Sequence, residues 1–567
     1  MVIEQGLVYD IGVIIIVATI LAYIAHLFRQ PFIPAYILTG VIIGPLVLGL
    51  VKDTADIASL SEIGIAFLLF IVGLEINLPK LKQVSLFAVV GGLLQVGITF
   101  AIGYLVGSLL GFSSLVSVYT GLIIAFSSTS VVVKLLKDKE VVDTLHGKLM
   151  LGLLIMQDVI VVFVLAALAT VTDFSFNVLG WAFLKTIILI LIVVIVSRFA
   201  LPGIFNFSAK SHELLFLWAV TIMFLFALLS SWFGFSIVIG AFMAGVGLAS
   251  LPYNHDIAGH VEGLRGFFST IFFVALGLHL VPITSSMVFT IIVLLLVVLI
   301  IKPIIIFLLA SIFGYEKRTS FITGVDMGQV SEFSLIMAVL AFYTFKHINQ
   351  EFFSIAIFVT ITSMLITSYI INHDSGLYLF FSRFLSPFEK LAVLKNKSTS
   401  LGYNKKKKHH VILFGCHRMG SMFLKNLQDI GKNVIVIDSN PDIIKQLMDK
   451  KVDCIYGDAT NIEVLRQINV SYAKMVISAI PDKEINKILV SYLKDINPQI
   501  VVVVTENHVE SALDLYSVGA DYVLLPHLFT GKHTAILMKK FLNDRNIATK
   551  LRKKHVSQLL NSDRFGH

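Results

Sequence analysis

The sequence predicts a multi-pass α-helical membrane protein joined to a cytoplasmic α/β domain, and three observations lead to this prediction. Apolar runs of about 20 residues, the length that crosses the hydrocarbon core, recur up to about residue 375. Two of these runs are interrupted by short polar segments. The remainder of the chain alternates short apolar strands with amphipathic helices. We therefore predict a transmembrane domain at 1–375, an amphipathic and basic linker at 376–408, a Rossmann-type domain at 409–545 and a tail at 546–567.

The composition agrees with a chain that lies mostly in lipid. Its 567 residues are 57% hydrophobic and 14% charged, and the mean hydropathy is +0.88. The net charge of +8 comes largely from loops and from the basic run at 405–408, so we expect it to orient the protein and contact anionic lipids rather than bind nucleic acid. Both cysteines, Cys416 and Cys454, fall in the soluble part, which is typical of a reducing cytosol without disulfides.

Hydropathy predicts about thirteen spans, and the loop charges predict their orientation. Basic residues gather in the odd-numbered loops and their flanks, which are therefore predicted to be cytoplasmic. The N-terminus is then outside and the soluble domain inside. The expected limits are 7–28, 32–50, 58–77, 84–111, 115–136, 146–170, 178–200, 214–231, 233–250, 265–281, 286–313, 319–345 and 353–373.

The two polar interruptions occupy matching places in the chain. The fifth span contains Ser127, Ser128, Thr129 and Ser130, and the twelfth contains the segment 328–332, which includes Gln329 and Glu332. If spans one to six and eight to thirteen form two halves, each interruption lies on the fifth helix of its half. The seventh span would place the halves in opposite orientations, as in the inverted repeats of secondary transporters. Two crossing broken helices would then direct free carbonyls and helix ends at one site, whereas the alternative is a pair of small-residue packing interfaces.

The sixth span carries Asp158, directly after Gln157 and near the centre of the run. A carboxylate at this depth is costly, and it is read first as part of an ion or proton path. Competition of a proton and a monovalent cation for Asp158 would couple the two fluxes. A structural ion pair is the alternative. We expect K⁺ or Na⁺ as the transported ion at Asp158 and no tightly bound metal.

Three further charged residues lie inside apolar spans. Lys302 is near the middle of the eleventh span, and Asp158 is the partner expected for it, although a lysine that only braces a broken helix is the other interpretation. Glu332 fits a structural or a functional role equally well. Asp326 is expected near a helix start, where it would cap the helix dipole.

Seven motifs follow one another along the membrane domain: ILTGVIIGP, FIVGLEINL, AFSSTSVVVKLL, GLLIMQDVIVV, VIGAFMAGVGLA, GFFSTIFFVALGLHL and MGQVSEFSLIM. In this order they resemble the membrane domain of the monovalent cation:proton antiporter-2 family, especially its Kef-type potassium efflux transporters. The resemblance implies that Asp158 carries both ion and proton. Members with Gln before this Asp resemble electroneutral potassium/proton exchangers, whereas members with two acids resemble sodium/proton antiporters, so Gln157 favours potassium. A sodium/proton antiporter and a ligand-gated potassium efflux channel remain alternatives, although the chain has no TVGYG-like filter.

The soluble part begins with the strand, turn and helix of a dinucleotide-binding pattern. The strand HHVILFG ends in Gly415, Gly420 opens a helix, and the next strand ends in Asp438. Further strands recur at VDCIYG, AKMVISAI, QIVVVVTEN and DYVLLP, which predicts a doubly wound sheet. The pattern departs from G-x-G-x-x-G because His417 stands at the middle glycine, where it would either block a dinucleotide or contact a phosphate.

The segment GDAT at 457–460 resembles the signature of potassium-conductance regulatory domains of the TrkA-N type. This resemblance implies a lobe that binds a nucleotide such as AMP, ATP or NAD(H) and dimerises to regulate transport, so we expect a homodimer in the inner membrane. A purely structural dimerisation lobe is the alternative. No substrate domain follows, which argues against an enzyme. The residues expected at the nucleotide are Gly415, His417, Arg418, Met419, Gly420, Asp438, Asp458 and Ala459.

Overall fold

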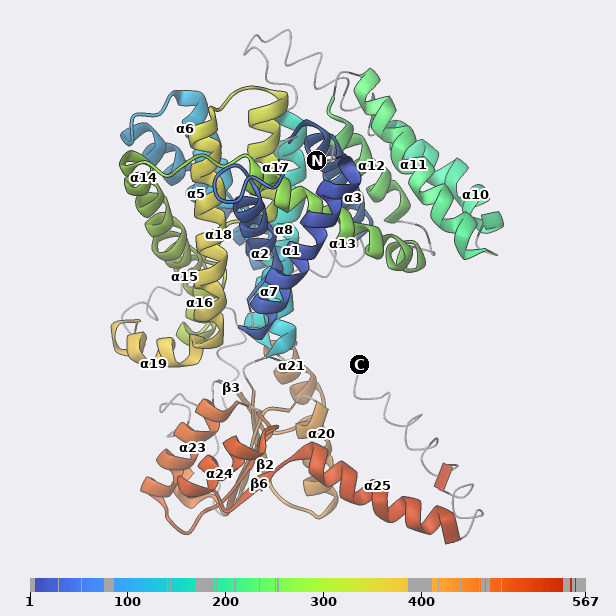
Figure 1. The fold of residues 1–567 in the computed structure, drawn as a ribbon. Helices are drawn as coiled ribbons and strands as arrows, with labels where there is room; N and C mark the ends of the chain where they lie inside the picture. The colour runs from blue at the N-terminus through green and yellow to red at the C-terminus, as the bar shows by residue number, and fades with distance from the viewer. Residues whose placement is uncertain are drawn as a thin grey trace. The chain divides into compact units, whose positions relative to one another are not determined.

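The computed structural model divides the chain into two compact units, Met1–Val393 and Leu394–His567, each described here by itself (Figure 1). The exact boundaries predicted for the segments stay predictions, and most of the predicted linker lies outside the described residues. The structure describes residues 6–28, 30–51, 54–75, 86–139, 141–142, 144–168, 185, 188–189, 191–208, 211–233, 235–249, 251, 254–385, 410–416, 418–438, 440–457, 459, 465, 470–480, 482–543, 551–552 and 556.

The secondary structure of the first unit, in its described residues, is helical. Within the described residues, seven helical stretches are long and apolar enough to cross a membrane, and six shorter apolar helices accompany them. Together they correspond in order to the predicted spans. The elements are α1 (Leu7–Leu27), α2 (Phe32–Ile43), α3 (Thr54–Glu75), η1 (Phe87–Gly91), α5 (Gly92–Leu109), α6 (Ser114–Ala125), α7 (Thr129–Asp138), α8 (Leu145–Leu168), η2 (Val196–Ala200), α10 (Leu201–Ser208), α11 (His212–Trp232), α12 (Ile237–Ala249), α13 (Asn254–Leu278), α14 (Ser285–Leu296), η3 (Val297–Ile301), α15 (Lys302–Ile312), α16 (Lys317–Asp326), α17 (Glu332–Val339), η4 (Leu340–Thr344), α18 (Gln350–Asn372) and α19 (Asp374–Leu385).

Both predicted helix breaks are present. The fifth span divides into α6 and α7, and the twelfth divides into α16 and α17. Each second half-helix starts at a serine cap: Ser128 accepts a bond from the amide of Val131, and Ser331 accepts one from the amide of Phe333. The expectation for Asp326 was wrong, because it is the last residue of α16 rather than near a helix start. The predicted interruption at 328–332 begins just after this residue, so Asp326 ends the first half-helix of this span instead of starting a helix.

Two pairs of helices pack with their backbones in direct contact. A Cβ atom added to Gly245 of α12 would lie 2.0 Å from the carbonyl oxygen of Phe70 on α3. One added to Gly277 of α13 would lie 2.1 Å from the carbonyl oxygen of Ile37 on α2. Small residues permit this approach between membrane helices, where packing rather than water exclusion drives association. Each pair joins a helix of the first half to a helix of the second half.

The second unit is a doubly wound sheet of six parallel strands in the order β3-β2-β1-β4-β5-β6. This order confirms the predicted Rossmann-like fold, and each strand falls within a segment expected from the sequence. Figure 1 shows α23 and α24 on one face of the sheet and α20 with α21 on the other. The elements are β1 (Val411–Phe414), α20 (Arg418–Asp429), β2 (Val434–Asp438), α21 (Pro441–Asp449), β3 (Cys454–Tyr456), η7 (Val470–Tyr472), β4 (Met475–Ser478), α23 (Lys483–Ile496), β5 (Val501–Thr505), α24 (Val509–Ser517), β6 (Tyr522–Leu524) and α25 (Pro526–Asn543).

The close contact at Gly245 predicts a specific loss of stability. We expect Gly245→Ala to lower the free energy of unfolding by about 1–3 kcal/mol, because the new methyl group would meet backbone rather than a movable side chain. Gly247→Ala on the same helix is the matched control, since its Cβ would be 3.4 Å from a Val193 methyl group, an ordinary contact. The measurement is the melting temperature of both variants in one detergent or nanodisc. Equal melting temperatures would contradict the tight α3–α12 contact.

The two cysteines of the second unit are predicted to be unreactive while it is folded. Burial and the Asp438 carboxylate raise the pKa of the Cys416 thiol to about 12, and burial with Asp453 raises that of Cys454 to about 11. The thiolate is the reacting form, so at neutral pH both should react with an aromatic disulfide reagent at least about a hundredfold more slowly than free cysteine. Raising the pH should speed the reaction, and denaturation should release both thiols at once. Fast reaction of either thiol in the folded protein would contradict this placement.

Candidate functional site

The two helix breaks contact each other through polar atoms. The hydroxyl of Ser127 donates a hydrogen bond to the carbonyl oxygen of Met327 at 2.9 Å. The side-chain nitrogen of Gln329 donates one to the carbonyl oxygen of Ser128 at 3.4 Å. All four residues of this crossing are at most 1% exposed. The broken helices therefore meet inside the first unit, as the inverted repeat requires.

Lys302 joins the two breaks. Its ammonium group donates to the carbonyl oxygen of Phe126 at 2.8 Å and to that of Gln329 at 2.7 Å, and its side chain is fully buried. These carbonyls follow the C-terminal ends of α6 and α16, where a cation is favoured. The sequence pointed to Asp158 as the partner, but the hydrogen bonds of Lys302 within the described residues go to these carbonyls. Broken helices leave such acceptors free, so this geometry favours the bracing role.

Two glutamines hold the first break from its other side. The side-chain oxygen of Gln157 accepts a bond from the amide of Ser127 at 2.7 Å, and its nitrogen donates to the side-chain oxygen of Gln95 at 2.6 Å. Gln95 in turn donates to the carbonyl oxygen of Ala125 at 3.0 Å. Sequence reasoning missed Gln95, although a single amide in an otherwise apolar span was the available signal. Both ends of the Gln157 amide are thus used to position the break.

Asp158 lies at the N-terminal end of α7. The hydroxyl of Thr129, the first residue of that helix, is 3.1 Å from Oδ1 and 3.0 Å from Oδ2 of the half-buried carboxylate. A helix N-terminus carries partial positive charge, and it stabilises an anion placed there. The hydroxyl and the helix end thus hold the carboxylate at the crossing, where an ion that reaches it would meet oxygen atoms.

A second carboxylate reaches the same segment. The hydroxyl of Ser130 donates to Oε2 of Glu332 at 3.2 Å and lies 3.2 Å from the hydroxyl of Ser128. Glu332 is the first residue of α17, so it too sits at the N-terminus of a half-helix. Because Thr129 binds Asp158 and the next residue binds Glu332, the two acids belong to one polar cluster. Such oxygen atoms are the ligands that hard monovalent and divalent cations prefer.

The second break is supported in the same way as the first. The amide of Val330 donates to the hydroxyl of Ser363 at 3.1 Å, and the hydroxyl of Thr367 donates to the carbonyl oxygen of Gly328 at 2.8 Å. Both hydroxyls come from α18, the sixth helix of its half, just as Gln157 comes from α8. The fourth helix of each half supplies the remaining polar group and contains a π-helical turn, η1 or η3. These correspondences match the predicted repeat.

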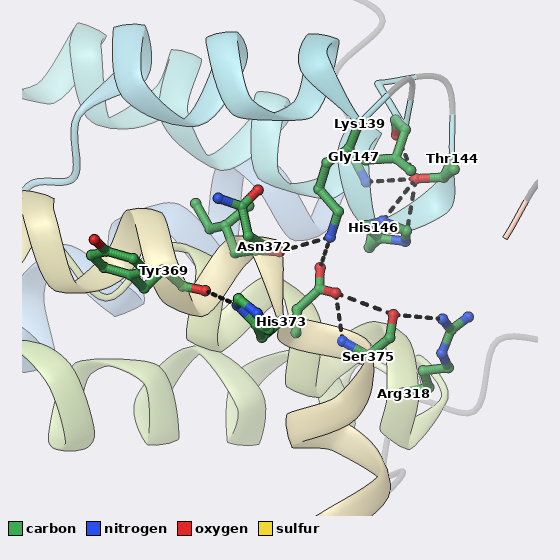
Figure 2. Close-up of polar contacts among 12 residues, drawn as sticks. Lys139, Thr144, His146, Gly147, Arg318, Tyr369, Asn372, His373 and Ser375 are labelled. Carbon is green, nitrogen blue, oxygen red and sulfur yellow. Dashed lines mark hydrogen bonds and ion pairs between the residues drawn. The ribbon is translucent and has the colours of Figure 1, made fainter. Parts of the chain in front are cut away.

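A charged cluster lies where α7 ends and α19 begins (Figure 2). The ammonium group of Lys139 donates to Oδ2 of Asp374 at 2.7 Å and to the carbonyl oxygen of Ile371 at 2.7 Å. The other oxygen of Asp374 accepts bonds from the amide and hydroxyl of Ser375, whose hydroxyl also accepts one from Arg318 of α16 at 3.4 Å. We call Lys139, Asp374, Ser375 and Arg318 the α19 cluster. Sequence reasoning did not single it out.

A cavity of about 420 Å³ lies elsewhere in the first unit, between α3, α11, α12, α13 and η4. Ser59 and Glu62 line it from α3, and His279 and Tyr343 line it from the second half. Its lining includes none of the predicted ion-site residues. The polar cluster at Asp158 is therefore defined by its hydrogen bonds rather than by this cavity.

The second unit contains the tight glycine turn that was predicted between β1 and α20. Gly415 adopts a φ of +78°, and a Cβ on Gly420 would lie 1.9 Å from the carbonyl oxygen of Gly415. The position of Gly415 needs a residue that tolerates positive φ. The position of Gly420 needs a residue without a side chain, so that α20 can approach the turn. Met419 is half-buried, and Ala459 is buried beside the sheet.

Asp438, expected at the ribose, binds the protein's own backbone. Its carboxylate accepts bonds from the amide of Cys416 at 2.7 Å and from that of Asn440 at 2.8 Å. It thereby links the glycine turn after β1 to the end of β2. His417, Asp458 and the side chain of Arg418 lie outside the described residues.

Comparison with known proteins places this geometry in a family. The pattern described as "Sodium/hydrogen exchanger, transmembrane" matches residues 13–373, and that of the TrkA-N domain matches 411–526. The chain is 26% identical over 532 residues to the putative cation/proton antiporter YbaL of Escherichia coli strain K12, covering 90% of this chain and 93% of that protein. It is also 26% identical over 498 residues to the glutathione-regulated potassium-efflux system protein KefC of Klebsiella pneumoniae, covering 86% and 77%.

A solved structure shares the fold of the first unit. The sodium proton antiporter of Methanocaldococcus jannaschii aligns with a TM-score of 0.50 and 18% identity, over 67% of this chain and 97% of that one. The first pattern covers more than half of the chain, and the second matches the domain that contains the six-stranded sheet. The chain therefore belongs to the sodium/hydrogen exchanger family and carries a TrkA-N domain.

Proposed function

We propose that the protein exchanges a monovalent cation for a proton across the membrane, and that the two ions compete for Asp158. The observation that carries the proposal is the position of this carboxylate at the crossing of two broken helices, against the hydroxyl of Thr129. An acid within the membrane, placed among broken-helix ends, is the usual form of a coupled ion site in secondary transporters. Relatives named a putative cation/proton antiporter and a potassium-efflux system protein support the same activity.

Competition at one carboxylate explains the coupling. Asp158 carries one negative charge, which either a proton or one monovalent cation neutralises. A cation that loses its water at the site would be compensated by carboxylate oxygen and by the hydroxyls of Thr129 and Ser130. Glu332 lies in the same cluster and is proposed to contribute negative potential. One charge moves in each direction per cycle, so the exchange is proposed to be electroneutral.

We propose potassium as the transported cation. Gln157 directly precedes Asp158, and its amide is committed to Ser127 and Gln95, so it supplies no second charge. The name of the KefC relative supports potassium, whereas the archaeal antiporter is named for sodium, which remains the second candidate. A ligand-gated potassium efflux channel is the candidate from another class.

The second unit is proposed to be a cytoplasmic nucleotide sensor. Gly415 and Gly420 form the tight turn that admits a phosphate to a helix N-terminus, which fits AMP, ATP or NAD(H). Asp438 could receive ribose hydroxyls only by exchanging its bonds to Cys416 and Asn440. We further propose that the protein is a homodimer in the inner membrane, with its N-terminus outside and this domain inside.

Loss of the carboxylate tests the transport proposal. In proteoliposomes, wild-type protein should show proton flux driven by a potassium gradient, and Asp158→Asn should reduce it to the level of empty vesicles.

Thr129→Val should weaken the apparent potassium affinity about 10–100-fold, because a hydrogen bond to a charged group contributes about 1.5–3 kcal/mol. Thr129→Ser retains the hydroxyl and is the matched control.

Each outcome separates the candidates. A flux preferring sodium would keep Asp158 but replace the cation. Potassium flux without coupled proton movement would favour the channel. Full coupled exchange by a folded Asp158→Asn variant would overturn the mechanism.

The nucleotide proposal predicts a ligand-dependent melting temperature. One of AMP, ATP or NADH should stabilise the full-length protein, by about 2.7 kcal/mol at a hundred times its dissociation constant. Adenosine is the control, because it lacks the phosphate that the glycine turn would hold. If no nucleotide changes the melting temperature at millimolar concentration, the lobe is structural and not a nucleotide sensor.

A further inference from the structure

We propose that Asp326 is a second proton-binding group of this transporter, and that Lys139 is its counter-charge. The inference rests on the proposed exchange at Asp158 and extends it to a second acid on the other broken helix. The proton at Asp326 would decide whether Lys139 stays with Asp374 in the α19 cluster.

Asp326 is buried, and no residue that the structure describes forms a hydrogen bond with its side chain. It is 1% exposed, and neither carboxylate oxygen has a partner among the residues that the structure describes. Burying an ionised carboxylate in this way is far more costly than burying a neutral carboxyl group. Asp326 is also the last residue of α16, and a helix C-terminus disfavours negative charge. Both effects favour the protonated form in this conformation.

The helix break itself does not require an acid at this position. In the other half, the helix before the break, α6, ends at Ala125, an apolar residue. The break after Ala125 forms with an apolar residue there, supported by Gln95 and Lys302. A helix can therefore end before such a break without an acid. The free-energy cost of burying Asp326 is then not explained by formation of the break. A role in proton binding accounts for it.

Lys139 and Asp374 are the charged groups whose fields act most on Asp326. The helices packed against α16 are α15, α8, α18 and α19, and α7 brings Lys139. Lys139 and Asp374 form an ion pair, in which Nζ of Lys139 lies 2.7 Å from Oδ2 of Asp374. The described charged and titratable groups on these elements and at their caps, α16 included, are Lys302, His146, Lys148, Asp158, Glu351, Tyr369, His373, Asp374, Tyr378, Lys134, Lys137, Asp138, Lys139, Glu316, Lys317 and Arg318.

These neighbours connect the proton to α19. While Asp326 is neutral, Lys139 has one acidic partner, Asp374, and the structure shows this pair. When Asp326 releases its proton to water, two acids compete for one ammonium group. Lys139 then loosens from Asp374, the first residue of α19. In the sequence, residues 386–409 connect α19 to the six-stranded sheet, so the protonation of Asp326 would affect the helix that precedes this connection.

Infrared difference spectroscopy of the full-length protein in lipid tests the proton directly. During a pH titration, wild-type protein should show the carbonyl band of a protonated buried carboxyl group, and the band should vanish in Asp326→Asn. Asp158→Asn is the matched control and should retain this band. If Asp326→Asn fails to fold, Asp326→Ala, which reproduces the end of α6, replaces it. A titration identical in wild type and the folded Asp326 variant would overturn the proposal.

The pH profile of exchange tests the link to Lys139. Asp326→Asn should lose one limb of the wild-type dependence of exchange rate on pH, and Asp374→Asn should lose the same limb while it keeps the infrared band. An unaltered profile in both variants would show that the proton at Asp326 does not control exchange, which would overturn that link. The two proposals fail separately. Exchange that survives in Asp158→Asn rejects the exchange mechanism, whereas a missing Asp326 band rejects only this inference.

Discussion

Lipid cannot hydrate the backbone groups that a broken helix leaves free, so the protein must satisfy every one of them from within. Much of the first unit is arranged around this constraint. Lys302 donates to a carbonyl of each break, Gln157 accepts from the first break, and Ser363 accepts from the second. The same arrangement concentrates hydroxyl and carboxylate oxygens where the helices cross. The proposed ion site therefore follows from repairing the breaks, with Asp158 and Thr129 added at one helix end.

The fold was predictable because hydropathy and polar interruptions are properties of neighbouring residues. The spans, both breaks and the parallel sheet follow from such patterns. Contacts between distant residues were harder to predict. The sequence marked Lys302 as needing a partner but could not rank a carboxylate against two freed carbonyls, since that depends on which acceptor the fold brings close. Gln95 was missed for a related reason, because its role appears only beside Gln157.

In the second unit too, the backbone features were predictable from the sequence, whereas the role of a side chain was not. Gly415 and Gly420 were identified because a turn conformation and a close approach permit no other residue without strain. Asp438 was expected to await a ribose, yet its oxygens bind two amides of its own domain. A single acid can serve both purposes in turn, and residue type alone does not tell them apart. The glycine positions therefore report the fold, while the ligand depends on side chains that surround it.

The π-helical turns η1 and η3 give the fourth helix of each half an extra residue ahead of Gln95 and Lys302. Successive residues of an α-helix are separated by about 100° around its axis. Removing one residue from either turn would restore a regular helix and rotate the following face by that angle. The amide or ammonium group would then point away from the crossing. These two turns thus set the angular phase at which each polar group meets its break, and a single-residue deletion would be more disruptive there than a substitution.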